Sequence, residues 1–226
     1  MELKDRVVVI TGALGSLGRA VSAVLAEAGA KVVGIDCVDG KPESAVAVFK
    51  VLDLGDAAAT KQTIAAIAAE CGHIDALVNI AGGFAWETLA DGAIETWDQQ
   101  YQINLRTAVS ASSATLAHFP GSGGRIINIS AAGAMKAAMG MGAYAAAKSG
   151  VARFTEALSE ELKPKNITVN ALMPSVIDTK PNRDAMPDAD YSTWVTPKAL
   201  AEVILFLASD RGEPITGALI PVMGRV

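Results

Sequence analysis

The chain has 226 residues, of which 51% are apolar and 19% are charged. This composition excludes intrinsic disorder, which requires low hydrophobicity and high net charge. The net charge of −5 argues against a nucleic-acid partner, and no apolar run reaches the roughly 20 residues of a membrane span. The first residues are charged and lead directly into a strand pattern, with no signal peptide. We therefore expect a cytoplasmic protein that contacts neither nucleic acid nor membrane.

Hydrophobic periodicity predicts strands that alternate with helices along the chain. The predicted strands are 6–11, 31–36, 45–51, 74–80, 125–130, 167–172 and 218–222. The predicted helices are 16–28, 56–70, 94–118, 144–162 and 197–208. The third helix is expected to be uninterrupted, and little helical pattern lies between Pro174 and Pro197. This order predicts α/β architecture: one doubly wound Rossmann domain over residues 1–226, with helices on both faces of a mostly parallel seven-stranded sheet.

The first predicted strand runs into a glycine-rich turn, Thr11-Gly12-Ala13-Leu14-Gly15-Ser16-Leu17-Gly18. Gly12 allows a tight turn, Gly15 lets the backbone approach a pyrophosphate, and Gly18 lets the helix pack close to the strand. The free N–H groups and the positive dipole end of the following helix favour phosphate at the same place. Three glycines are a weak signal by themselves, but their position between a strand and a helix predicts dinucleotide binding.

Asp36 ends the second predicted strand, 18 residues after Gly18. A carboxylate at this position can accept hydrogen bonds from both ribose hydroxyls of NAD, and it would repel a 2′-phosphate. Arg19 is a competing feature, because a base beside the turn could attract that phosphate. A strand-end turn is the structural alternative for Asp36. We expect NAD(H) to be preferred over NADP(H), because a carboxylate in direct contact should outweigh a solvated arginine.

Tyr144 and Lys148 are four residues apart at the start of a predicted helix, so their side chains share one face. A neighbouring ammonium favours the phenolate and is expected to lower the pKa of the tyrosine. Such a tyrosine can exchange a proton with a substrate oxygen or nitrogen. For this pair alone, an amphipathic helix with an exposed lysine would be the better interpretation.

Taken together, these motifs resemble the short-chain dehydrogenase/reductase family over nearly the whole chain. The resemblance also rests on Asp53-Leu54, Asn79-Ile80-Ala81-Gly82, Asn104 and the segment Pro174–Thr179. It implies that Tyr144 donates the proton, that Lys148 holds the nicotinamide ribose, and that Asn104 positions a water in the proton relay. The cofactor-binding residues that it implies are Gly12, Gly15, Ser16, Leu17, Gly18, Asp36, Asp53, Leu54, Asn79, Ala81, Gly82, Tyr144, Lys148, Pro174, Ile177 and Thr179.

Among these, the resemblance assigns Asp53 to the adenine, and Ile177 and Thr179 to the carboxamide. It also implies a small-molecule substrate and a homodimer or homotetramer built through the two long helices 94–118 and 144–162. No metal site is expected, because neither the two histidines nor the two cysteines have metal-ligand spacing.

The sequence departs from the family pattern where a catalytic serine usually stands. The position 13 residues before Tyr144 holds Ala131, and Ser130 precedes it. Either the strand end shifts and Ser130 is catalytic, or the site has no serine. A one-residue shift turns a side chain to the other face of the sheet, so we favour the second alternative. Smaller departures are Ser16 in a usual glycine position and Ile80 in place of an asparagine.

Alanine at this position resembles one subgroup of the family, the quinonoid dihydropteridine reductases. The segment 178–194 and the aromatic Phe84 after two glycines resemble the same subgroup, whereas Asn104 resembles ordinary bacterial-type carbonyl reductases. The sequence therefore predicts an NAD(H)-dependent reductase of a C=O or C=N group, with dihydropteridine reduction as an alternative. A non-catalytic dinucleotide-binding regulator is an alternative of another class.

A short lid at about 175–196 is expected to cover the substrate. Aromatic and methionine side chains of the predicted loops are expected to face the same cleft and to favour a flat, apolar substrate. The candidate substrate residues are Phe84, Trp86, Met139 and Trp194.

Overall fold

The computed structural model describes all 226 residues and contains one sheet of seven strands in the order β3-β2-β1-β4-β5-β6-β7. The strands are β1 Val7–Thr11, β2 Lys31–Asp36, β3 Val46–Val51, β4 Ala76–Asn79, β5 Gly124–Ile129, β6 Ile167–Pro174 and β7 Leu219–Val222. Every neighbouring pair is parallel. The predicted Rossmann-type sheet is therefore confirmed, and it is wholly parallel rather than mostly so.

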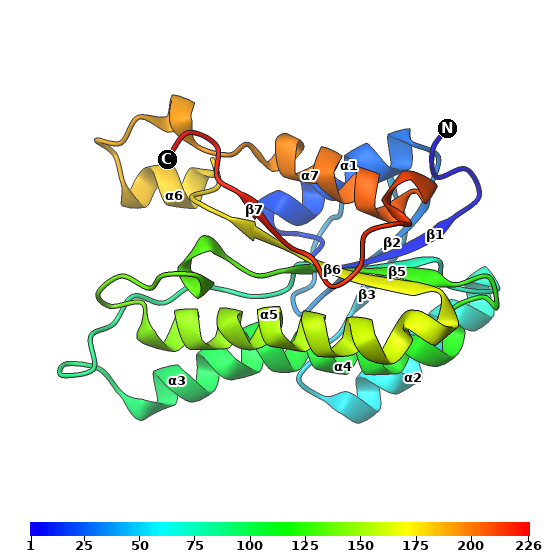
Figure 1. Cartoon of the computed structure of the whole chain (residues 1–226), viewed down its shortest axis with the longest axis horizontal. Helices are drawn as coiled ribbons and strands as arrows, with labels where there is room; N and C mark the ends of the chain where they lie inside the picture. The colour runs from blue at the N-terminus through cyan, green and yellow to red at the C-terminus, as the bar shows by residue number, and fades with distance from the viewer.

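Helices cover both faces of the sheet, as the alternation of elements predicts (Figure 1). Their bounds are α1 Ser16–Glu27, α2 Ala57–Cys71, α3 Ile94–Gln100, α4 Thr107–Thr115, α5 Gly142–Leu162, α6 Lys180–Ala185 and α7 Pro197–Ala208. In Figure 1, α1 and α7 lie on one side of the sheet, and α2, α4 and α5 lie on the other. None of these helices combines the length and the apolar character that crossing a bilayer would require.

The apolar run of β1 divides its side chains between two cores. Val8 and Ile10 belong to the cluster that includes α1 and α7, whereas Val7 and Val9 belong to the cluster under α2, α4 and α5. All four side chains are almost completely buried. A strand covered on both faces has no polar side to present, which explains why its sequence is continuously apolar.

The expected single helix 94–118 is interrupted. After α3, the segment Tyr101–Arg106 is π-helical, α4 follows directly, and a 3₁₀ turn ends at His118. The amide of Asn104 donates to the Gln100 carbonyl four residues earlier, at 3.1 Å, a group that normally accepts from the helix backbone. This competition is a physical reason for the wider turn, and it falls at a candidate catalytic residue.

The segment between Pro174 and Pro197 contains a helix that the periodicity does not predict. Thr179 caps α6 by accepting from the Asn182 N–H, and Pro181 occupies its first turn. Asp178 binds Arg183 through both carboxylate oxygens, at 2.6 and 2.8 Å. The helix was missed because it is only six residues long and has no apolar face.

The order of the strands locates the site. From β1 the chain passes to β2 on one side of it, and β4 pairs with β1 on the other side. Connections that leave β1 and β4 therefore diverge to opposite halves of the sheet. In an open parallel sheet, ligands bind in the crevice that this divergence creates at the carboxyl ends of the strands.

Candidate active site

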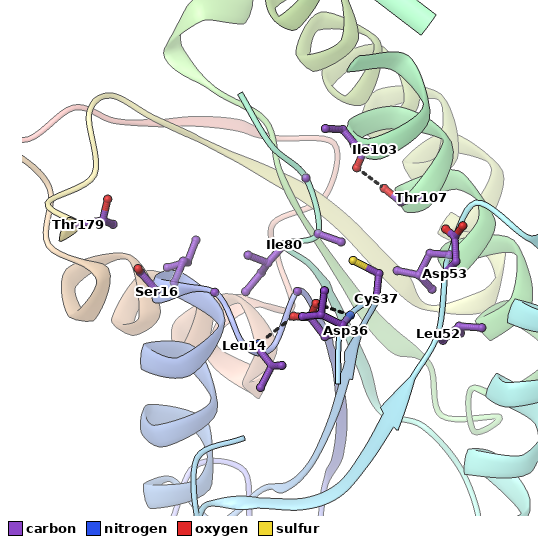
Figure 2. A pocket seen from close by; sticks show the side chains of 17 residues that line it. Leu14, Ser16, Asp36, Cys37, Leu52, Asp53, Ile80, Ile103, Thr107 and Thr179 are labelled. Atoms are coloured by element: carbon purple, nitrogen blue, oxygen red, sulfur yellow. Dashed lines mark hydrogen bonds between the residues drawn. The ribbon is translucent and has the colours of Figure 1, made fainter. Parts of the chain in front are cut away.

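A pocket of about 710 Å³ opens at the carboxyl ends of β1, β2 and β4 (Figure 2). Ten of the residues predicted to bind a cofactor line it: Gly12, Gly15, Ser16, Leu17, Asp36, Asp53, Leu54, Ala81, Gly82 and Thr179. Figure 2 shows Thr179 beyond Ser16, at the far end of the pocket from Asp53. The structure thus brings together residues that span most of the sequence, including one from the predicted lid.

The glycine turn has the backbone geometry that the sequence predicts. Gly12 has φ +67°, a conformation that side chains disfavour, and a Cβ on it would lie 3.0 Å from the Ala81 backbone. A Cβ on Gly18 would overlap the Gly12 carbonyl oxygen, so this glycine allows α1 to pack against the turn and is not itself in the pocket. The N-terminus of α1 remains open toward the pocket, because Gly15 offers no capping side chain.

Asp36 has two roles at the end of β2. Its Oδ2 accepts from the Leu14 N–H at 2.9 Å, which holds the glycine turn against β2, and its carboxylate also lines the pocket. Arg19 does not face this carboxylate freely. Its guanidinium donates to the Leu14 carbonyl at 2.9 Å, to Glu43 at 3.0 Å and to the Lys41 carbonyl at 3.2 Å. Arg19, which from the sequence is a candidate partner of a 2′-phosphate, is therefore hydrogen-bonded to other groups of the protein.

The end of β4 is held in place by two buried side chains. Thr11 accepts from the N–H groups of Ile80 and Ala81, at 3.0 and 3.1 Å. Asn104 accepts from the Gly83 N–H at 3.2 Å and donates to the Gly83 carbonyl at 3.0 Å. A side chain on Gly82 would overlap the Asn104 amide oxygen. These contacts place Asn104 directly against the loop that follows β4.

Tyr144 and Lys148 lie on the first turns of α5, with the lysine Nζ 5.9 Å from the centroid of the tyrosine ring. Lys148 is buried, and its Nζ donates to the Ile129 carbonyl at 2.8 Å. A Cβ on Gly82 would lie 3.4 Å from the same nitrogen. Gly82 lines the pocket, so the Lys148 Nζ lies close both to the pocket wall and to the Tyr144 ring.

The expectation that Lys148 lowers the pKa of Tyr144 is wrong. Burial raises the pKa of the tyrosine to about 12, and burial lowers the pKa of Lys148 to about 8. The lysine donates to a backbone carbonyl, so loss of hydration outweighs its attraction for a phenolate. Tyr144 is consequently a neutral phenol over the ordinary pH range.

Ser130 is buried, and its hydroxyl donates to the Lys148 carbonyl at 2.8 Å. The hydroxyl thus fixes β5 to α5, and the same two segments are joined again by Lys148 and Ile129. Ala131, the next residue, is also buried. The absence of a catalytic serine stays a prediction, and the structure shows the Ser130 hydroxyl bound to a backbone carbonyl.

The remaining predicted cofactor residues lie outside the pocket. Asn79 is buried and donates to Ser112 and Asn128, at 3.1 and 2.8 Å, so its side chain joins β4 to α4 and β5. Pro174 is the last residue of β6. Ile177 forms a bridge to Val195, and its carbonyl accepts from the Asn182 amide. In this structure, none of these three residues lines the pocket.

The four candidate substrate residues differ in exposure. Phe84 and Trp86 are each 58% exposed and Met139 is 78% exposed, whereas Trp194 is only 7% exposed. The Trp194 ring packs against Tyr191 with a centroid distance of 4.9 Å. The expectation that Trp194 faces the cleft is therefore not met, because the indole is buried against Tyr191.

Several pocket residues were not predicted from the sequence: Leu14, Cys37, Val38, Leu52, Ile80, Ile103 and Thr107. Two signals were available for some of them. Cys37 and Val38 directly follow Asp36, and Ile103 and Thr107 are four residues apart beside Asn104, which places them on one helix face. Neither signal identifies these residues as part of a binding site until the fold shows which elements lie together.

Comparison with known proteins agrees with the fold and the site. The sequence model of the family described as short chain dehydrogenase matches residues 6–190. The chain is 30% identical to the 3-oxoacyl-[acyl-carrier-protein] reductase of Thermotoga maritima, over 99% of this chain and 98% of the relative. It is also 30% identical to the 2-dehydro-3-deoxy-D-gluconate 5-dehydrogenase of Escherichia coli, over 98% and 95%.

A solved structure of a dehydrogenase has a similar fold. Carveol dehydrogenase from Mycobacterium avium, in complex with NAD, superposes with a TM-score of 0.88 at 27% identity, over 99% of this chain and 98% of that chain. The Rossmann-type fold and the matched sequence define an oxidoreductase that uses NAD(P)(H). The chain belongs to the short-chain dehydrogenase/reductase family.

Proposed function

We propose that the protein is an NADH-dependent reductase of a C=O or C=N group, with Tyr144 as the proton donor. The observation that carries this proposal is the position of Lys148. Its Nζ lies 5.9 Å from the centroid of the Tyr144 ring and next to Gly82, which lines the dinucleotide-sized pocket. One end of a dinucleotide bound along the pocket would thus lie beside the Tyr144 phenol. Hydride and proton could then reach the two atoms of one double bond.

The residues present fit a nicotinamide dinucleotide. The open N-terminus of α1 would hold the pyrophosphate, and Asp36 and Asp53 lie where the adenosine half would bind. Lys148 and Thr179 would hold the nicotinamide half. The cofactor would supply the hydride. The chain itself contributes orientation and the proton, which passes from the Tyr144 hydroxyl to the substrate oxygen or nitrogen.

The protonation state of Tyr144 favours the direction of reduction. A phenol with a pKa near 12 is protonated at neutral pH, as a proton donor must be. Oxidation of an alcohol or amine would require the phenolate, of which very little is present under these conditions. We therefore propose reduction as the direction in which this site works best.

The preference for NADH over NADPH is proposed from two carboxylates. Asp36 faces the pocket, and Glu43 holds Arg19 at 3.0 Å. We expect the double substitution Asp36→Ser, Glu43→Gln to shift the ratio of kcat/KM for the two cofactors toward NADPH by about 100-fold or more, because a like-charge contact costs several kcal/mol. Removing Arg19 in the same background should reduce the shift, because only the part supplied by the freed guanidinium depends on this residue.

The control for this prediction is Glu70→Gln, which breaks a comparable ion pair with Lys50 on the surface. It should leave the cofactor ratio unchanged. Steady-state rates with both cofactors provide the measurement. A double variant that still rejects NADPH as strongly as the wild type would show that these carboxylates do not determine the preference.

Reduction of a quinonoid dihydropterin is a second candidate, and the serine position favours it. The Ser130 hydroxyl is committed to the Lys148 carbonyl, and the next residue is Ala131. A quinonoid imine is reactive and needs less polarisation than a ketone. A site without a serine hydroxyl is therefore better suited to such a substrate than to an unactivated ketone.

The test is NADH oxidation with three substrates: a quinonoid dihydropterin, a flat aromatic diketone and a 3-oxoacyl thioester. Turnover of at least one, lost on replacement of Tyr144, is the expected result. If the protein binds NADH and oxidises it with none of the three, the result would favour a non-catalytic dinucleotide-binding regulator.

A further inference from the structure

Phe84 makes an unusual contact for a residue that is 58% exposed. Its ring meets the ring of Tyr144 edge to face, with a centroid distance of 5.0 Å and an interplanar angle of 82°. An exposed phenylalanine in a loop normally contributes little to the stability of the fold. Here the ring covers one side of the group that the proposed function uses as its proton donor.

The loop that carries Phe84 is anchored on both sides of this residue. Asn104 holds Gly83 through the Gly83 N–H and carbonyl, at 3.2 and 3.0 Å. Further along the loop, the Glu87 N–H donates to the Gly140 carbonyl at 2.8 Å. Gly140 belongs to the segment that leads into α5, so the second anchor fixes the loop to the chain that delivers Tyr144. Phe84 is thus held in a defined position despite its exposure.

Packing surrounds the phenol on more than one side. Gly133, from the turn after β5, lies on Tyr144 as well, since a Cβ there would be 3.9 Å from the Tyr144 Cε1. The Ser130 hydroxyl donates to the Lys148 carbonyl. The orientation of the ring therefore depends on its neighbours in van der Waals contact.

We propose that Phe84 is a positioning residue for Tyr144: the contact between the two rings fixes the direction of the phenol and excludes water from it. The inference rests on the proposed function, because positioning matters only if Tyr144 donates the proton. Asn104 acts through the same contact, since it holds the loop. A substrate that stacks on the exposed part of Phe84 would meet a phenol whose direction is already set.

The proposal predicts a change in the titration of Tyr144. The charged group that faces the phenol is Lys148, from the same helix, whereas Phe84 and Gly133 pack against it from other elements and carry no charge. Burial alone raises the pKa of Tyr144. Removing the Phe84 ring should admit water and bring this pKa back toward the ordinary value for tyrosine.

The experiment compares Phe84→Ala, Phe84→Tyr and Leu89→Ala. Leu89 is an exposed residue of the same loop region, at 79%, and serves as the matched control. The first readout is the ¹³C NMR titration of Tyr144 in protein labelled at tyrosine Cζ, with the resonance assigned from Tyr144→Phe. The second is kcat and KM with NADH and either quinonoid dihydropterin or 9,10-phenanthrenequinone, measured across pH.

In Phe84→Ala, we expect the Tyr144 resonance to titrate at least about one pH unit lower. We also expect kcat to fall about 10-fold or more, with the KM for NADH unchanged. Phe84→Tyr, which keeps the ring, should restore both properties, and Leu89→Ala should change neither. Thermal melting checks that each variant is folded. The titration needs no substrate, so it tests the shielding of the phenol by Phe84 separately from turnover.

The outcomes separate the two proposals. Full turnover in Tyr144→Phe would refute the proposed function, and the positioning role with it. Loss of turnover in Tyr144→Phe, together with wild-type titration and kcat in Phe84→Ala, would refute the positioning role alone.

Discussion

Replacing Tyr144 by phenylalanine is expected to lower turnover by about 1,000-fold or more, because a positioned proton donor contributes roughly 100- to 10,000-fold to such reactions. The substitution removes only the hydroxyl, and the ring contact with Phe84 at 5.0 Å can persist. Binding of NADH should remain near the wild-type value, since the pocket residues are unchanged. Steady-state kinetics and NADH fluorescence titration provide the two measurements.

Tyr101→Phe is the matched control, because this tyrosine is 46% exposed on the π-helical segment and has no part in the proposed chemistry. It should keep full activity. A Tyr144→Phe enzyme within about 10-fold of the wild-type rate would contradict a proton-donor role for Tyr144. Loss of NADH binding in the same variant would show instead that the residue serves the cofactor.

The parts of the molecule that follow from local sequence were predicted correctly. The apolar run in β1 and the glycines after it specify a buried strand and a tight turn by themselves, whatever the rest of the chain does. At the start of the predicted helix 56–70, the Asp56 carboxylate caps α2 by accepting from two backbone N–H groups. Alternation of such elements is then sufficient to predict the parallel sheet.

The parts that depend on neighbours distant in sequence were not predictable. The sequence places Arg19 beside the glycine turn but does not show that Glu43 binds it. It places Trp194 in a loop, but only the folded lid shows that the indole packs inward on Tyr191. The pKa of Tyr144 is the clearest example, because burial by other elements outweighs the charge four residues away.

Replacing Lys148 by methionine is expected to stabilise the protein at neutral pH while lowering turnover by about 100-fold or more. Burial lowers the pKa of this lysine from 10.5 to about 8, a change that corresponds to a cost of about 3 kcal/mol for the buried charge. The variant also loses the hydrogen bond to the Ile129 carbonyl, worth about 1 kcal/mol. The net gain in the free energy of unfolding should be about 2 kcal/mol at pH 7.

This gain should depend on pH in a definite direction. Below pH 8 the lysine is protonated in both the folded and the unfolded states, so its burial has the full cost. Between pH 8 and 10.5 the unfolded chain keeps a proton that the folded state has lost, so the wild type gains stability as the pH rises. The advantage of the methionine variant should therefore shrink across this interval.

Urea unfolding at pH 7 and pH 10 measures the effect, and ionisation of Tyr144 in the unfolded chain is common to the wild type and the variant. Lys165→Met, at an exposed position just after α5, should show no gain at either pH. A Lys148→Met protein that is less stable than the wild type at pH 7 would contradict the cost assigned to the buried ammonium. A gain in the free energy of unfolding over the wild type that is the same at both pH values would contradict it as well. The expected result would show that the fold accepts an unfavourable buried charge at the point where the dinucleotide pocket meets the proton donor.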